Sequence, residues 1–123
     1  MVLFDTDVLI DHLLGKAGAT QTMLKFKNSR SFCSVITIGE ILFGMKLSEK
    51  DKTFSLVDSL EALEVTKNIV ISAYEIKNSC KGFTLELYDC IIAATALDKD
   101  LILVTKNSKH YPDKRLKLFV PEY

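Results

Sequence analysis

The alternation of short apolar runs with segments of helical periodicity constrains the fold most. The apolar runs that predict strands are residues 2–4, 31–35, 63–65, 101–104 and 116–120. Apolar residues recur at helical spacing between them, in segments ending near Gly15 and Gly82 and covering about 20–28, 37–47, 50–60 and 84–99. Strands separated by helices join through right-handed crossovers. The pattern predicts an α/β domain with a mostly parallel sheet of four or five strands, flanked by helices.

Two sequence signals set helix starts in this prediction. Thr37-Ile-Gly-Glu40 has the S/T-x-x-E form of a capping box, which would open a helix and place Glu40 in its first turn. Thr84 is expected to cap the strongly apolar helix that reaches about Lys99. Asp89 would then lie in the opening turns of that helix.

Length and composition restrict the class of protein. A chain of 123 residues suits one domain covering 1–123, and 48% hydrophobic residues exclude a disordered chain. No apolar run approaches the roughly 20 residues that span a bilayer, and no secretory signal is recognisable. The three cysteines form no CxxC pair, so we expect reduced, buried thiols in the cytoplasm. A net charge of zero argues against indiscriminate nucleic-acid binding.

Polar side chains distant in the sequence are expected at one edge of the sheet. Asp5 directly follows the first strand, and Glu40 follows the second. Asp89 begins the helix that leads into the strand ending at Val104. The residues that follow this strand add Thr105, Asn107 and His110. Ligands of parallel sheets bind outside the carboxyl ends of the strands, so this edge is the expected site.

The residue types at this edge favour a hard divalent cation. Asp5, Glu40 and Asp89 would repel one another unless a cation lay between them. Oxygen ligands without cysteine or paired histidines point to Mg²⁺ or Mn²⁺. Such a site suits phosphodiester hydrolysis by an activated water.

Four segments resemble the motifs of PIN-domain ribonucleases. They are Asp5-Thr6-Asp7-Val8-Leu9-Ile10-Asp11, Ser34-Val-Ile-Thr-Ile-Gly-Glu40-Ile-Leu, Tyr88-Asp89-Cys-Ile-Ile-Ala-Ala94 and Leu103-Val-Thr105-Lys-Asn107-Ser-Lys-His110-Tyr111. Their order and spacing match over nearly the whole chain, and the short one-domain form is similar to VapC-type toxins. The resemblance implies a Rossmann-like PIN fold, Mg²⁺-dependent RNA cleavage, dimerisation and inhibition by a VapB-type antitoxin.

Two residues depart from the family's pattern. Asp7 stands where Asn is usual, which adds a negative charge near the expected metal. His110 stands at the position of the fourth acidic residue, where it could contact a phosphate or bind metal weakly. These departures leave open whether one or two ions bind.

Each candidate residue also has a purely structural interpretation. Asp5 could be only the N-cap of the first helix, and Glu40 only half of the Thr37 capping box. Thr6 would brace a turn, and Asn107 would form a turn or hold Asp5 or the substrate. Asp89 is harder to explain this way, because a carboxylate in an apolar helix needs a partner.

Basic residues cluster near the end of the chain. Lys106, Lys109, Lys114, Arg115 and Lys117 would form either a solvated face or, beside a metal site, a surface that positions an RNA backbone. For the first four, RNA binding is the prediction.

Three competing functions remain open from the sequence. A small haloacid-dehalogenase-like phosphatase would use Asp5 as a covalent nucleophile and Asp7 as acid or base. A receiver domain would need a phosphoacceptor Asp at the end of a central strand, whereas Asp51 and Asp58 fall in an expected helix. The third alternative is a non-catalytic PIN-like RNA-binding module.

Overall fold

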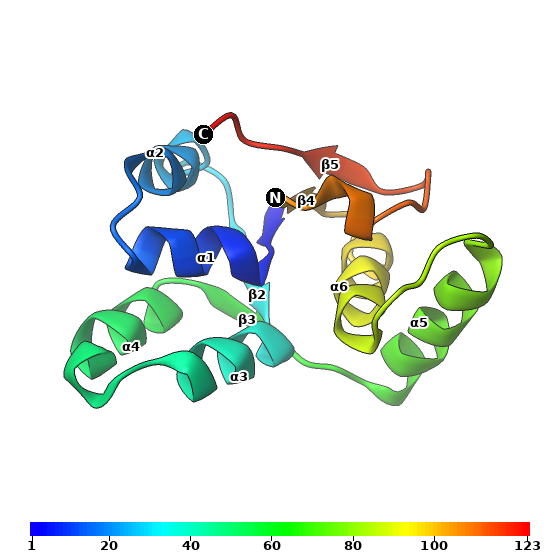
Figure 1. The fold of residues 1–123 in the computed structure, drawn as a ribbon, viewed down its shortest axis with the longest axis horizontal. Coiled ribbons are helices and arrows are strands. Elements are labelled where there is room, and N and C mark those ends of the chain that lie inside the picture. Colours follow the sequence, from blue (N-terminus) through cyan, green and yellow to red (C-terminus); the bar gives the residue numbers. More distant parts are fainter.

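A five-stranded, wholly parallel sheet forms the centre of the molecule. The computed structural model describes residues 1–123, with strands β1 (Val2–Phe4), β2 (Ser31–Ser34), β3 (Glu61–Leu63), β4 (Ile102–Val104) and β5 (Lys117–Phe119). Their order is β3-β2-β1-β4-β5, so β1 is the central strand (Figure 1). The predicted α/β class, parallel sheet and strand number are confirmed.

Six helices cover the two faces of this sheet. They are α1 (Thr6–Leu13), α2 (Ala17–Lys25), α3 (Val35–Gly44), α4 (Lys50–Asp58), α5 (Lys67–Ser79) and α6 (Leu87–Asp98). Two short 3₁₀ turns, η1 (Leu47–Glu49) and η2 (Ser108–His110), complete the regular structure. Figure 1 shows α5 and α6 together on one side of the strands and α1 to α4 on the other.

Alternation of side chains along β1 divides the core into two parts. Leu3 packs with buried residues of α5 and α6, such as Ala73 and Ile92. Val2 and Phe4 point the other way and pack with residues from the first helices. Because β1 is buried on both faces, its residues are all apolar, as expected for a central parallel strand.

Both predicted capping signals are wrong. Helix α3 begins at Val35, because the Ser34 side chain at the end of β2 accepts from the backbone N–H of Ile36 at 3.1 Å. Thr37 therefore lies inside the helix, fully buried, and Glu40 lies beyond the first turn. Helix α6 begins at Leu87 with Glu86 as N-cap residue, so Thr84 precedes the helix. Asp89 does lie in its first turn, as predicted.

Other boundaries shift by a few residues. Helix α2 covers 17–25 rather than 20–28, and the chain turns at Phe26, whose ring packs against Phe4 and Phe119. Strand β3 covers 61–63 rather than 63–65, because Glu61 pairs in register with Phe32 of β2. Helix α3 ends at Gly44 rather than 47, and the strands expected at 31–35, 101–104 and 116–120 are each slightly shorter.

Two expectations from composition concern the cysteines and the membrane. All three cysteines are free thiols, with Cys33 and Cys90 buried and Cys80 partly buried. None of the helices combines the length and the apolar character that crossing a bilayer requires.

Candidate active site

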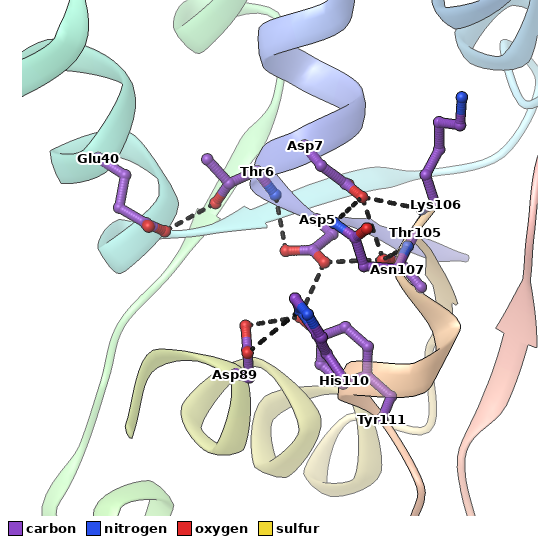
Figure 2. A network of polar contacts seen from close by, with 10 residues as sticks. All are labelled: Asp5, Thr6, Asp7, Glu40, Asp89, Thr105, Lys106, Asn107, His110 and Tyr111. Carbon is purple, nitrogen blue, oxygen red and sulfur yellow. Dashed lines mark hydrogen bonds and ion pairs between the residues drawn. The ribbon is translucent and has the colours of Figure 1, made fainter. Parts of the chain in front are cut away.

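Asp5 lies at the carboxyl end of the central strand and is almost completely buried, at 7% exposure. Its Oδ1 accepts from the backbone N–H of Thr6 at 2.8 Å, which makes Asp5 the N-cap of α1. Its Oδ2 accepts from the hydroxyls of Thr105 and Tyr111, both at 2.8 Å (Figure 2). Asp5 therefore caps α1, and its second oxygen contacts residues from the segment that follows β4.

Asp89 reaches the same place from the first turn of α6. Its Oδ1 lies 3.5 Å from the Tyr111 hydroxyl oxygen, and its Oδ2 lies 3.5 Å from Nδ1 of His110. The Tyr111 hydroxyl oxygen contacts both carboxylates, so Asp5 Oδ2 and Asp89 Oδ1 lie on either side of one oxygen atom. The structure therefore brings together Asp5 and Asp89, which lie far apart in the sequence.

Glu40 approaches from α3 and is exposed. Its Oε1 accepts from the Thr6 hydroxyl at 2.8 Å, and the Thr6 oxygen also lies 3.0 Å from the buried hydroxyl of Thr37. Thr6 thus connects the first turn of α1 to α3. Thr6 was expected to brace a turn, and its hydroxyl instead links α1 to Glu40 and Thr37 of α3.

Asp7 joins α1 to the segment after β4. Its Oδ2 accepts from the backbone N–H of Lys106 at 2.9 Å and from the side-chain amide of Asn107 at 3.0 Å. Thr105 lies at 3.4 Å from the same oxygen, and the Val8 N–H donates to Oδ1 at 2.7 Å. Asn107 was expected to form a turn or to hold Asp5 or the substrate. Its carbonyl accepts from the His110 N–H at 2.9 Å at the start of the η2 turn, and its side chain binds Asp7.

These side chains surround a cavity of about 380 Å³. Its lining consists of Asp5, Thr6, Asp7, Ile10, Glu40, Thr84, Glu86, Tyr88, Asp89, Ile92, Asn107 and His110. Every predicted catalytic residue lines it, and no lysine or arginine does. Figure 2 shows the acidic side chains converging from β1, α1, α3 and α6.

The electrostatics of the cavity follow from burial and from the closeness of its acidic groups. Burial, with the charge of Asp5 adding to it, raises the pKa of Asp7 to about 6 despite its backbone hydrogen bonds. Burial also raises the pKa of Asp89, where His110 opposes the effect and the charges of Asp5, Glu86 and Glu40 add to it. Burial and Asp5 hold the pKa of Tyr111 far above its usual value, so its hydroxyl remains a donor. A bound cation would relieve this repulsion.

The donor set fits Mg²⁺ or Mn²⁺, since carboxylates dominate it and no cysteine takes part. However, no three acidic, histidine or cysteine side chains converge tightly enough to enclose an ion. Thr6 holds Glu40, and Asp89 lies beside His110. The expected cluster of three carboxylate ligands is therefore not preformed: Asp5 and Asp89 are together, and Glu40 stands apart at the cavity wall.

The sequence interpretation missed several residues of the site. Tyr111 contacts both central carboxylates, Thr37 supports Thr6, and Glu86 adds a charge to the cavity. Tyr111 is the last residue of the fourth motif, and that position was the signal that could have found it. Thr37 was misread as a helix cap, and Glu86 had no signal that set it apart from a surface residue.

The basic residues of the predicted RNA-binding surface fall into two groups. The Lys106 ammonium donates a hydrogen bond to the backbone carbonyl oxygen of Tyr123 at 2.5 Å. Its nitrogen also lies 3.8 Å from the centre of the Tyr123 ring. Arg115 forms two side-chain hydrogen bonds with the buried carboxylate of Asp113. Lys109 and Lys114 are exposed and have no hydrogen-bond or ion-pair partner.

Comparison with protein families and curated proteins gives a consistent result. The family model described as PIN domain matches residues 2–113. Ribonuclease VapC10 of Mycobacterium tuberculosis is 31% identical over 115 residues, covering 91% of this chain and 86% of the relative. Ribonuclease VapC1 of Methanocaldococcus jannaschii is 30% identical over 127 residues, covering 96% and 82%.

Solved structures with similar folds cover almost the entire chain. A toxin–antitoxin complex from Klebsiella pneumoniae contains a chain with a TM-score of 0.86 and 26% identity, covering 99% of this chain and 98% of that one. VapBC2 from Rickettsia felis, bound to a DNA fragment from its promoter, gives a TM-score of 0.85 at 18% identity, with 98% of both chains covered. The second likeness concerns the fold alone.

Proposed function

This chain belongs to the PIN-domain family and, within it, to the VapC ribonucleases, and on that premise we propose that its acidic cavity hydrolyses RNA phosphodiester bonds with a divalent ion held by Asp5, Glu40 and Asp89. One observation carries the proposal: Asp5 and Asp89 meet at Tyr111 in a cavity whose lining holds no lysine or arginine. A group of carboxylates with no lysine or arginine among them is the setting in which Mg²⁺ or Mn²⁺ binds.

The chemistry divides between the ion and the protein. A bound divalent ion would supply a water of lowered pKa and neutralise charge on the phosphate. Asp5 and Asp89 would hold it, and Glu40 would join them by turning away from Thr6. Thr105 keeps Asp5 oriented through its hydroxyl. His110, exposed at the rim beside Asp89, is placed to contact a phosphate.

The two other catalytic alternatives fit the structure less well. The haloacid-dehalogenase-like alternative has no support from the comparisons, whereas the PIN-domain family model matches residues 2–113. The receiver-domain alternative required a phosphoacceptor at a strand end, but Asp51 and Asp58 lie in α4. The non-catalytic PIN-like RNA-binding module is decided by the assay below.

The test is cleavage of mixed RNA with and without Mn²⁺. Asp89→Ala should abolish cleavage and leave the circular dichroism spectrum unchanged. Asp5→Asn should do the same, and it is preferable to Asp5→Ala because the amide oxygen can still cap α1. Asp98→Ala, at the exposed end of α6, is the matched control and should retain full activity. Equal residual cleavage in all four proteins would leave only the RNA-binding alternative.

The partner in this proposal is a VapB-type antitoxin that neutralises a toxin. Its support is the toxin–antitoxin complex with the same fold and an apolar groove of about 330 Å³ beside the cavity, lined in part by Phe43 and Tyr88. Phe43 is 96% exposed, which is unusual for so large an apolar side chain. Growth arrest on expression, relieved by co-expression of an adjacent small open reading frame, is the expected outcome. If expression causes no growth arrest and the neighbouring reading frame has no effect, the chain has another PIN-domain role.

Two finer parts of the proposal concern assembly and compartment. We expect a homodimer. Light scattering gives the molecular mass of the isolated chain and of its complex with the antitoxin, and comparing the two distinguishes a self-association surface from an antitoxin surface. Free thiols at Cys33, Cys80 and Cys90 favour a reducing compartment, in line with a cytoplasmic location.

A further inference from the structure

We infer that the hydroxyl of Tyr111 is a positioning group that sets the separation between the Asp5 and Asp89 carboxylates and so controls how tightly the cavity binds a divalent ion. The inference rests on the proposed metal site, and it assigns to Tyr111 a role that neither carboxylate can fill.

The geometry is that of a bridge between two elements. The Tyr111 hydroxyl donates to Asp5 Oδ2 at 2.8 Å, and its oxygen lies 3.5 Å from Asp89 Oδ1 (Figure 2). Asp5 comes from the end of β1, and Asp89 comes from the first turn of α6. No other side chain contacts both: Thr105 reaches Asp5, and His110 reaches Asp89.

The phenol ring gives this bridge a fixed position. Tyr111 is 3% exposed and belongs to the same core cluster as Leu103 and Ile92, so its hydroxyl has little freedom to move. A fully packed ring holds its oxygen where the surrounding core places it. The distance between the two carboxylates is thereby tied to the packing of β4 and α6.

A neutral hydroxyl is suited to this task. Asp5 is buried and Asp89 is partly exposed, and their charges repel each other; a hydroxyl that donates to Asp5 offsets part of this repulsion without carrying a positive charge. A lysine at this place would neutralise the pair and compete with a metal. With Tyr111, no positive charge lies between the two carboxylates to compete with an ion.

Thr105 provides the comparison that separates bridging from simple support. Its hydroxyl donates to the same Asp5 oxygen at the same distance of 2.8 Å, but its other contacts are with Asp7 and Asn107. Thr105→Val removes one donor from Asp5 and leaves the link to Asp89 intact. Tyr111→Phe removes one donor from Asp5 and breaks the link, while the ring still fills the core.

The experiment is calorimetric titration of the purified proteins with MnCl₂, after removal of metal by chelation. Tyr111→Phe should bind Mn²⁺ about tenfold more weakly than wild type, in the range found when groups that orient metal ligands are removed. Thr105→Val should lose less affinity. Tyr74→Phe, on the exposed face of α5, should bind like wild type. Circular dichroism and melting curves check that all variants are folded.

Two outcomes would overturn the inference. Unchanged Mn²⁺ affinity in Tyr111→Phe would show that the bridge does not act on the metal site. Equal decreases in affinity in Tyr111→Phe and Thr105→Val would show that Tyr111 is only one more donor to Asp5. Failure of the wild-type protein to bind Mn²⁺ would instead refute the proposed metal site itself and the inference with it.

Discussion

Asn107 donates its side-chain amide to Asp7 Oδ2 over 3.0 Å, which fastens the segment after β4 to the first turn of α1. The backbone N–H of Lys106 donates to the same oxygen at 2.9 Å. Asp7 is thus both a structural fastener and a charge beside Asp5. The hydrogen bonds hold the segment after β4 in place, and the charge on Asp7 depends on pH.

The stability of the protein should depend on the ionisation of Asp7. Its pKa is about 6 in the folded chain against an ordinary value of 3.8, so the folded state binds the proton more tightly than the unfolded state. This contribution to stability is fully present below pH 3.8 and is lost as the pH rises through about 6. The loss should be about 2 kcal/mol after allowance for solvent screening.

Asp7→Asn tests this dependence. The substitution removes the titrating group, so the difference in unfolding free energy between the variant and wild type should shift in favour of the variant between about pH 4 and pH 6. Urea unfolding at a series of pH values in the presence of a chelator measures it. A constant difference between the two proteins across this range would contradict the assignment.

Divalent ions should stabilise the folded protein. An ion that binds only the folded state adds about 2.7 kcal/mol at a concentration one hundred times its dissociation constant. The physical source is relief of the repulsion around Asp5 and Asp89. Melting curves with added Mn²⁺ should show an upward shift of roughly 10 °C for a domain of this size. Asp89→Ala should show little of this shift, and an equal shift in that variant would place the stabilising ion elsewhere.

Gly18 and Gly39 should respond in opposite directions to alanine. A Cβ at Gly18 would overlap the side chain of Tyr123, which would have to leave its place and give up its hydrogen bond to Asp11. We expect Gly18→Ala to destabilise the fold by about 2 kcal/mol. Gly39 lies inside α3 with no atom near an added Cβ, so Gly39→Ala should stabilise it by about 0.5–1 kcal/mol. Denaturant unfolding of both variants gives the comparison.

The exposed lysines should determine the salt dependence of RNA binding. In an Asp89→Ala background, which prevents cleavage, Lys109→Ala with Lys114→Ala should weaken binding of single-stranded RNA. It should also reduce the slope of log affinity against log salt by about 1.4, because each phosphate that a cation neutralises contributes roughly 0.7. Lys106→Ala should leave the slope unchanged, because that ammonium is already bound to Tyr123. Filter binding at several salt concentrations measures both. A reduced slope for Lys106→Ala alone would reverse the assignment of these residues.

The sequence predicted the alternation of strands and helices well because burial on both faces demands apolar strands and one-sided burial demands helical periodicity. Helix starts were predicted poorly. Ser34 and Thr37 are both good capping residues, and the choice between them depends on where β2 ends and on the Thr6 hydroxyl that Thr37 meets. Such contacts between distant segments are not visible in a local pattern.

The site shows the same division. The placement of Asp5 at this edge followed from topology, since it ends β1, and Asp89 was expected there because α6 begins at the same edge before leading into β4. The binding of Glu40 by Thr6 and the direction of the Tyr111 hydroxyl depend on side-chain conformations that only the packed structure determines. The same holds for the capture of Lys106 by Tyr123.

The position of β1 between β2 and β4 has a consequence for biosynthesis. Thr105 and Tyr111, which hold the first carboxylate of the site, are translated 100 and 106 residues after it. The cavity that we propose as the site of RNA cleavage can therefore form only after nearly all of the α/β domain has been translated.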